Sequence, residues 1–340
     1  MNRRHFFLGL AGLAGCTRGR RPRLNVYNWS NYVAPDTIAN FEREFGVSVR
    51  YGVYDSNEEM LAKALTGNSG WDVVFPSNYL IRPMTENGLL APLRHESLRN
   101  LDKLDTRFQA PSWDSSLRWC APYMWGGSGI IFNRKLSPAP TAWSDLWRAD
   151  LRNRITMLDD PAEVLGASLK KLGYSINSVD AGELQRASQE AKAQKQLLRA
   201  YLNAEVRDQL VAGDITVAQL WATTSQQAID STPALGFVYP AEGFALYADN
   251  AAILRESRRE RLAHEFVDYL LRPAVSAAIV TATRTATANR GALELLPESA
   301  RSNATLYPAP EILQRGEWFE PLPAAAQRLR DRLWTEIKSF

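Results

Sequence analysis

Residues 24–75, LNVYNWSNYVAPDTIANFEREFGVSVRYGVYDSNEEMLAKALTGNSGWDVVF, alternate between short apolar runs and amphipathic segments. The apolar and alternating stretches are typical of strands. A proline at the first turn and a capping box, Ser56-x-x-Glu59, open two helical segments, and Gly46 ends the first of them. We predict strands at 24–27, 47–53 and 72–75 and helices at 35–46 and 56–65. This β-α-β-α-β order predicts a mostly parallel sheet covered by helices.

The same alternation returns later in the chain and predicts a second α/β unit. A length of 340 residues suits about two domains. No linker rich in Gly, Ser or Pro separates them, so we expect two lobes between which the chain crosses more than once. The predicted elements of this part are helices at 141–147, 161–173, 184–201 and 259–271, and strands at 155–158, 215–220 and 236–239.

Composition and motifs exclude several classes of protein. Of the 340 residues, 45% are hydrophobic and 23% charged, which is typical of a globular chain. A formal net charge of +3 gives no reason to expect nucleic-acid binding. Two cysteines and three scattered histidines do not suggest a disulfide scaffold or a metal site. His264 falls on the polar or boundary face of its helix, where a structural or solvated role is expected. We predict no catalytic residue, metal or cofactor.

The first 16 residues indicate export. Arg3 and Arg4 precede an apolar run, residues 6–15, that is too short to span a bilayer. The run ends in Leu13-Ala14-Gly15-Cys16, which resembles the lipobox of bacterial lipoproteins. We predict a signal peptide at 1–15, lipidation of Cys16 and a basic tether at 16–23. The alternative is an ordinary cleaved signal with a chance cysteine, and both the general and the twin-arginine export routes stay open. Cys120 is left without a disulfide partner.

Aromatic and polar side chains follow several of the predicted strands. They lie in the stretches 28–32, 76–79 and 221–224, and Tyr247 and Asp249 lie in or at the end of another strand. In an open parallel sheet, ligands bind beyond the carboxyl ends of the strands. Aromatic faces and carboxylates together suit a cationic ligand. Asp160 and Glu163 have a second interpretation, because acids at a helix start also stabilise the helix dipole.

Eight short stretches, in order and at matching spacing across residues 24–320, resemble the spermidine/putrescine-binding proteins of bacterial ABC transporters. They are 26–32, 54–58, 71–77, 121–126, 158–164, 239–243, 270–273 and 305–308. The resemblance implies a two-lobed periplasmic-binding-protein fold of type II. In that fold each lobe is a mostly parallel sheet flanked by helices, and the chain makes two hinge crossings. We expect one lobe at 24–125 and 248–293 and the other at 126–247 and 294–340.

The resemblance also implies a set of ligand-binding residues. Family aromatics, acids and hydroxyls match many positions of this chain, with Asn203 matching only loosely. The residues assigned to the ligand site are Trp29, Ser30, Asn31, Tyr32, Ser77, Tyr79, Asp160, Glu163, Trp221, Thr224, Tyr247, Asp249 and Phe319.

Two of these residues depart from the family pattern. Asn31 stands where the family usually has an acid, and Phe319 stands where spermidine-type members have glutamine. We therefore expect one end of the site to be less acidic and more apolar. The hypothesis is a weaker hold on one terminal ammonium, or a ligand with a different end group.

The resemblance implies a receptor outside the cytoplasm, and the lipobox-like stretch predicts that it is lipid-anchored in the periplasm or at the cell surface. It would bind a polyamine as a monomer and deliver it to a membrane permease, without catalysis or a cofactor. One alternative is a polyamine-sensing receptor that signals through a membrane sensor protein. An enzyme using Asp160 and Glu163 is disfavoured because no nucleophile or metal motif accompanies them. A metal receptor of the same fold is disfavoured because the assigned lining is aromatic and contains no histidine. Which polyamine binds stays open at this point.

Overall fold

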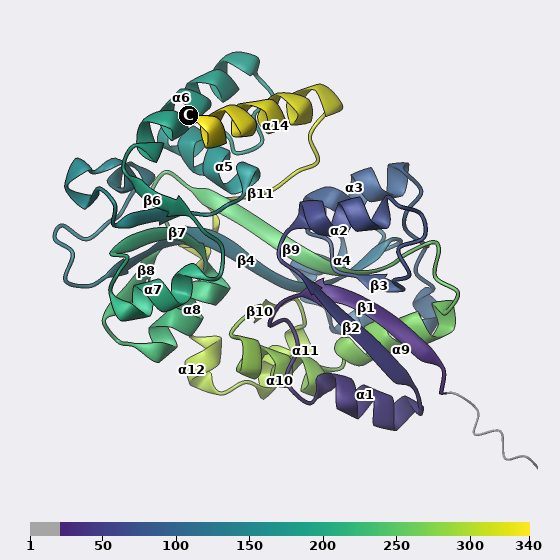
Figure 1. The fold of residues 1–340 in the computed structure, drawn as a ribbon. Helices are drawn as coiled ribbons and strands as arrows, with labels where there is room; N and C mark the ends of the chain where they lie inside the picture. The colour runs from purple at the N-terminus through teal and green to yellow at the C-terminus, as the bar shows by residue number, and fades with distance from the viewer. Residues whose placement is uncertain (1–20) are drawn as a thin grey trace, which may run out of the picture.

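The computed structural model describes residues 21–340. The predicted signal peptide, the lipidation site Cys16 and most of the tether lie outside the described residues. Two α/β lobes lie side by side, and two long antiparallel strands, β4 (Cys120–Asn133) and β9 (Phe244–Ile253), run from one lobe into the other (Figure 1). The expected fold class is confirmed.

The first lobe begins with the predicted β-α-β-α-β unit. Its strands are β1 (Arg23–Trp29), β2 (Ser48–Tyr54) and β3 (Val73–Val74), and its first helices are α1 (Thr37–Phe45), α2 (Asn57–Ala64) and α3 (Asn78–Glu86). Strand β1 pairs in parallel with both β2 and β3. Gly46 ends α1 in the left-handed region at φ 66°, and Ser56 Oγ accepts the Glu59 amide at the start of α2. Two of the local signals quoted above therefore act as predicted.

The second lobe repeats the arrangement after β4. Its elements are β5 (Ile155–Met157), α5 (Pro161–Lys171), α6 (Ala181–Lys195), β6 (Leu198–Tyr201), α7 (Val206–Ala212), β7 (Val217–Trp221), α8 (Ala222–Ser231) and β8 (Leu235–Val238). Strand β5 pairs in parallel with β6 and β7. The strand order through both lobes is β2-β1-β3-β9-β4-β7-β5-β6.

One helix was predicted to extend beyond its actual C-terminal end. The helix expected at 184–201 ends at Lys195, and residues 198–201 form β6 instead. The backbone of this segment pairs with β5, and Leu198 is buried in the core of the lobe. Strand pairing with a distant segment thus overrides the local preference for helix.

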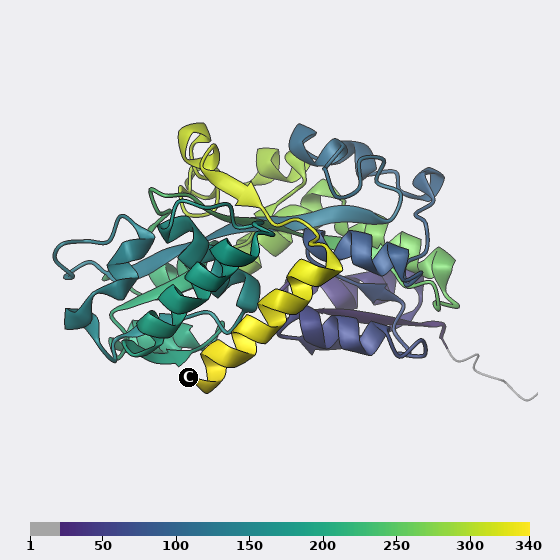
Figure 2. The ribbon, with the colours of Figure 1, turned by 90° about the horizontal axis from the view of Figure 1, so that it is seen from above.

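Shorter elements and the C-terminal segments complete the fold. They are η1 (His95–Ser97), η2 (Leu101–Lys103), α4 (Thr106–Gln109), η3 (Trp143–Trp147), η4 (Ala149–Leu151), α9 (Glu260–Leu270), α10 (Pro273–Thr283), β10 (Ala286–Thr287), α11 (Arg290–Leu295), α12 (Glu298–Arg301), α13 (Pro310–Leu313), β11 (Gly316–Trp318) and α14 (Ala324–Ser339). Strand β11 pairs in parallel with β9, and the chain then passes to α14, which packs against α5 and α6 (Figure 2). This passage adds a further connection beside β4 and β9.

Several side chains singled out from the sequence have structural roles. His264 is 1% exposed, so it lies deeper than the polar or boundary face predicted for it, and its Nε2 accepts the Arg94 amide at 2.9 Å. Cys120 is buried and unpaired. A Cβ at Gly126 would lie 2.6 Å from Tyr247 Oη, so this glycine permits close packing of β4 against β9. Among residues 21–340, no single helix is long and apolar enough to cross a membrane, although α9 and α10 pass that test as a pair bent by 70°.

Candidate functional site

A cavity of about 500 Å³ lies between the two lobes. All thirteen residues assigned to the ligand site from the sequence line it, although they span residues 29 to 319. The cavity is also lined by Asp55, Asn57, Ala162, Asn203, Ala204, Glu205, Thr223 and Gln227.

The cavity lies where strands of both lobes end. Trp29 is the last residue of β1, and Ser77 precedes α3 after β3. In the other lobe, Asp160 precedes α5 after β5, and Trp221 ends β7 and precedes α8. Because carboxyl ends of parallel strands share one edge of a sheet, each lobe collects its polar and aromatic residues on one edge. The two edges face each other across the cavity.

Asp249 is the buried carboxylate on the first-lobe side. It is 2% exposed and lies on β9. Its Oδ1 accepts Ser77 Oγ at 2.6 Å, and its Oδ2 accepts Tyr32 Oη at 2.7 Å. Burial raises the pKa of Asp249 to about 6, although both hydroxyl donors work in the opposite direction. The carboxylate has no ion-pair partner among the described residues, so it is ready to accept a cation.

Glu163 and Asp160 form the corresponding pair on α5. Glu163 is 3% exposed, and its Oε1 accepts Ser128 Oγ at 2.6 Å and Trp221 Nε1 at 3.1 Å. Burial, with the nearby charge of Asp160, raises the pKa of Glu163 to about 8.

Asp160 also caps α5, since its Oδ1 accepts the amides of Ala162 and Glu163 at 2.8 and 3.0 Å. Asp160 therefore stabilises the start of α5, in line with its second interpretation, and this role is compatible with a place in the cavity wall. Glu163 does more than stabilise a helix end, because its side chain lies in the wall and contacts Trp221.

Aromatic rings supply most of the remaining wall. Trp29 donates its indole N–H to Phe75 O at 3.0 Å, which fixes the ring beside the cavity. Tyr79 and Phe319 meet edge to face with ring centres 5.7 Å apart. The full set of aromatic lining residues is Trp29, Tyr32, Tyr79, Trp221, Tyr247 and Phe319.

The cavity lining contains acidic side chains and no basic ones. Its lining contains five carboxylates, Asp55, Asp160, Glu163, Glu205 and Asp249, and no Lys, Arg or His. An anionic ligand would meet repulsion here, whereas ammonium groups would find carboxylates and aromatic faces. Within residues 21–340, no group of His, Cys, Asp and Glu has an arrangement suited to a metal ion.

The less regular lining residues have identifiable local roles. Ser30 Oγ donates to Asp55 Oδ1 at 3.2 Å. Asn31 adopts φ 55°, a left-handed conformation that Asn tolerates better than most residues. Thr224 is buried in the first turn of α8.

Asn57 is a cavity residue that the sequence interpretation missed. Its Nδ2 donates to Ser77 Oγ at 3.0 Å and to Tyr79 Oη at 2.9 Å, and its Oδ1 accepts the Ser77 amide at 3.2 Å. Asn57 thereby orients two other lining residues. Asp55 was missed as well. Asp55 directly follows β2 and Asn57 is the first residue of α2, so the rule of polar residues after strands could have found both.

A family model described as bacterial extracellular solute-binding protein matches residues 36–306, and the chain belongs to this family. The chain is 32% identical over 337 residues to a putrescine-binding periplasmic protein of Pseudomonas aeruginosa. The alignment covers 93% of this chain and 92% of that protein.

Two solved structures share the fold over almost the whole chain. A spermidine/putrescine ABC transporter substrate-binding protein of Streptococcus pneumoniae is 28% identical, with a TM-score of 0.82 over 94% of this chain and 99% of that one. A lipoprotein of Treponema pallidum is also 28% identical, with a TM-score of 0.83 over 93% and 99%. The family resemblance drawn from the sequence motifs is confirmed.

Proposed function

We propose that this protein captures a polyamine outside the cytoplasm and delivers it to the permease of an ABC transporter. The observation that carries the proposal is the cavity wall, in which five carboxylates and six aromatic rings occur without one basic side chain. The names of its relatives, which bind putrescine or serve spermidine/putrescine transport, support the same ligand class.

The wall offers two anionic regions for two ammonium groups. Asp249 would hold one from the first lobe, and Asp160 with Glu163 would hold another from the second. Tyr247 lies on β9 two residues before Asp249 and packs in one cluster with Trp221, whose indole donates to Glu163, so it connects the two regions. Its ring, with those of Tyr79 and Trp221, would cover the methylene groups between the amines. A ligand that contacts both lobes favours their closed arrangement.

The lobe boundaries expected from the sequence form part of the proposal, except that the last of them is proposed nearer to β11. They are 24–125 and 248–293 for one lobe, and 126–247 and 294–340 for the other. In support, residues 120–127 of β4 pair with β9, and residues 128–133 pair with β7 and β8. Leu296 and Ala300 pack against α10, which favours placing the last change of lobe nearer to β11.

The remaining parts of the proposal concern place and partners. Lipidation at Cys16 would anchor the protein to a membrane, and the Treponema pallidum relative is likewise a lipoprotein. We propose a monomer that catalyses no reaction, because a capture and delivery role needs neither an active site nor a second subunit. No observation favours the alternative of signalling through a membrane sensor.

Calorimetric titration tests the proposal directly. The chain from residue 17 onward is unfolded and refolded to remove any bound amine, then titrated with putrescine, spermidine, spermine and agmatine. We expect micromolar or tighter binding of at least one of them. The absence of heat with all four amines would overturn the proposal, provided that circular dichroism shows a refolded chain.

A further inference from the structure

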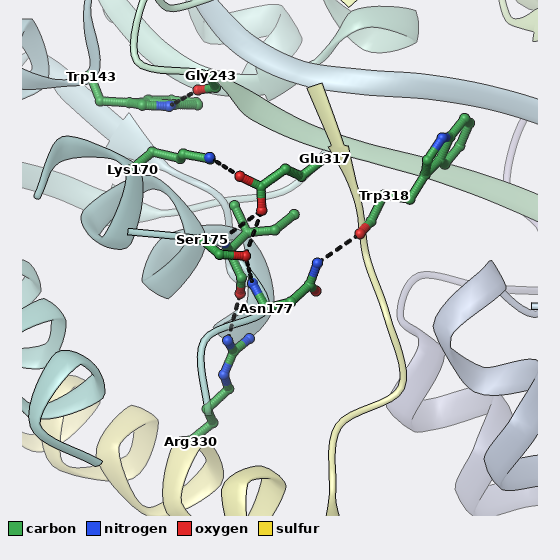
Figure 3. A network of polar contacts seen from close by, with 9 residues as sticks. Trp143, Lys170, Ser175, Asn177, Gly243, Glu317, Trp318 and Arg330 are labelled. Atoms are coloured by element: carbon green, nitrogen blue, oxygen red, sulfur yellow. Dashed lines mark hydrogen bonds and ion pairs between the residues drawn. The ribbon is translucent and has the colours of Figure 1, made fainter. Parts of the chain in front are cut away.

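Phe319 belongs to a short connecting segment, residues 316–320, which we call the strap. The strap follows β9 for three residues and then leaves the sheet toward α14. Phe319 lines the cavity, whereas the residues before and after it contact a loop of the second lobe, residues 173–178. Figure 3 shows the Glu317 side chain and the Trp318 carbonyl oxygen directed toward this loop. The position of one cavity wall therefore depends on contacts made outside the cavity.

Glu317 makes the first of these contacts. It forms an ion pair with Lys170 of α5. Its Oε2 accepts Ser175 Oγ at 2.6 Å and the Ile176 amide at 3.1 Å. Partial burial disfavours its charge, but the bonds from Lys170 and Ser175 outweigh this and lower the pKa of Glu317. Glu317 thus connects the strap to α5 and to the loop 173–178 through an ion pair and two hydrogen bonds.

Asn177 makes the second contact and holds the strap on both sides of Phe319. Its Nδ2 donates to Trp318 O at 2.9 Å, and its Oδ1 accepts the Glu320 amide at 3.0 Å. One side chain therefore satisfies the peptide groups immediately before and after Phe319. No other residue type of this size supplies a donor and an acceptor side by side.

The loop that carries Asn177 is itself fixed by hydrogen bonds from α14. Arg330 of α14 is 3% exposed, and its Nη2 donates to Ile176 O at 2.5 Å and to Ser178 O at 3.1 Å. Figure 3 shows its guanidinium directed from α14 toward this loop. Burial lowers the pKa of Arg330 to about 10. The buried guanidinium binds two backbone carbonyls of the loop and thereby holds the loop in position against α14.

The first lobe contacts the strap at Phe319 itself. Asn78 Nδ2 of α3 donates to Phe319 O at 2.5 Å, and the Phe319 ring meets Tyr79 edge to face. The ring also packs in a small cluster with Ile176 and Tyr247. Phe319 is therefore positioned by both lobes, and its ring covers one part of the cavity.

We propose that Asn177 and Glu317 are positioning residues that set which amine the cavity prefers, because they hold Phe319 in the wall. This inference rests on the proposed function. Neither residue lines the cavity, so any effect on binding must pass through the strap. A strap released on one side lets the Phe319 ring shift, which changes the space for the end of the ligand.

A double-mutant cycle tests the coupling. Asn177→Ala, Phe319→Ala and the double variant are titrated with putrescine and spermidine alongside the unmodified protein. We expect Asn177→Ala to weaken binding of the preferred amine by about fivefold and to change the preference between the two amines. In the Phe319→Ala background the same substitution should change binding by less than about twofold, because the ring that it positions is gone.

Two further variants separate positioning from loss of stability. Asn100→Ala removes a long-range bond to Asp268 in the first lobe, away from the cavity. It should lower the unfolding temperature as Asn177→Ala does and leave amine preference unchanged. Ser175 is exposed, and Ser175→Ala removes its bond to Glu317 and the bond that its Oγ accepts from the Asn177 amide at 3.1 Å. Because both bonds of the Asn177 side chain to the strap remain, this variant should act like a milder Asn177→Ala.

The outcomes distinguish the two proposals. If the unmodified protein binds no amine, the proposed function fails and this inference falls with it. If the unmodified protein binds but Asn177→Ala has the same effect with and without Phe319, the inference alone is overturned. An Asn177→Ala variant that fails to fold leaves the decision to Ser175→Ala in the same cycle.

Discussion

Tyr32 Oη donates a hydrogen bond of 2.7 Å to Asp249 Oδ2, joining residues that are 217 positions apart. Ser77 Oγ donates a second hydrogen bond, of 2.6 Å, to the other carboxylate oxygen, Asp249 Oδ1. The carboxylate is thus oriented by two neutral donors and lacks a positive partner among the described side chains. A group with this environment carries an electrostatic cost that a bound cation can remove.

The Asp249→Asn substitution tests this cost in two ways. Binding of the preferred amine should weaken by roughly tenfold or more, since a charge-assisted hydrogen bond is lost. The unliganded variant should be more stable than the unmodified protein at pH 8. Calorimetry and urea unfolding measure the two effects.

The sign of the stability effect follows from the raised pKa of Asp249, from 3.8 to about 6. The folded state binds the proton more tightly than the unfolded state does, so stability falls as pH rises through this range. The gain from Asp249→Asn should therefore vanish near pH 4. An equal gain at pH 4 and pH 8 would contradict the explanation.

Amine affinity should rise with pH between about 5 and 8. The unliganded site has raised pKa values at Asp249, about 6, and Glu163, about 8. An ammonium ligand favours the charged carboxylates, so binding releases protons and becomes tighter at higher pH. Alkyl amines stay protonated over most of this range, with a reference pKa of about 10.4 for the lysine amine.

Calorimetry in buffers with different ionisation enthalpies would count the released protons. In Glu163→Gln the rise between pH 7 and 8 should flatten, while the rise near pH 6 should remain. Affinity that is independent of pH would mean that these acids do not contact the ligand charge.

Asn31 offers a test of the less acidic end of the cavity. Replacing it with aspartate, Asn31→Asp, adds a carboxylate to a lining position where φ is 55°. Asp tolerates this conformation about as well as Asn, so the fold should be preserved.

We expect Asn31→Asp to bind the preferred polyamine about threefold to tenfold more tightly, by one added charge-assisted hydrogen bond. Competition titrations with putrescine, spermidine and agmatine would show whether the choice of ligand also changes. Unchanged affinity and choice would refute the hypothesis that Asn31 weakens the hold on a terminal ammonium.

The Gly126→Ala substitution tests the packing behind Tyr247. A new Cβ would lie 2.6 Å from Tyr247 Oη and 2.8 Å from its ring carbon Cζ. Overpacking of this kind costs about 1–3 kcal/mol of unfolding free energy. Because Tyr247 lines the cavity, amine binding should weaken in the same variant.

The double variant Gly126→Ala with Tyr247→Phe removes the hydroxyl that lies nearest to the new Cβ. It should recover part of the lost stability, as urea unfolding would show. A single substitution that leaves both stability and binding unchanged would mean that β4 adjusts freely at this position.

Local sequence signals determined the elements of the first lobe. Gly46 and Ser56 act as helix signals through contacts within a few residues of themselves, so no distant segment is needed to interpret them. The same holds for the aromatic and polar residues that follow β1, β3 and β7, because strand ends place them on the sheet edge of their own lobe. For the candidate site, these patterns and the family resemblance together assigned thirteen residues that line one cavity.

Long-range pairing decided what these signals could not. Residues 198–201 became β6 because β5 offered backbone partners. His264 is buried where η1 packs against α9, and the Arg94 amide donates to its ring there.

The environment of the carboxylates was also decided by the tertiary structure. A sequence shows that Asp249 and Glu163 are acids, but their raised pKa values depend on how many neighbours exclude water and on which donors face them. Asn177 illustrates the same limit, since its two bonds around Phe319 join residues that are more than 140 positions apart. Periodicity and capping act within a few residues, whereas burial and the charge environment arise only when distant segments pack together.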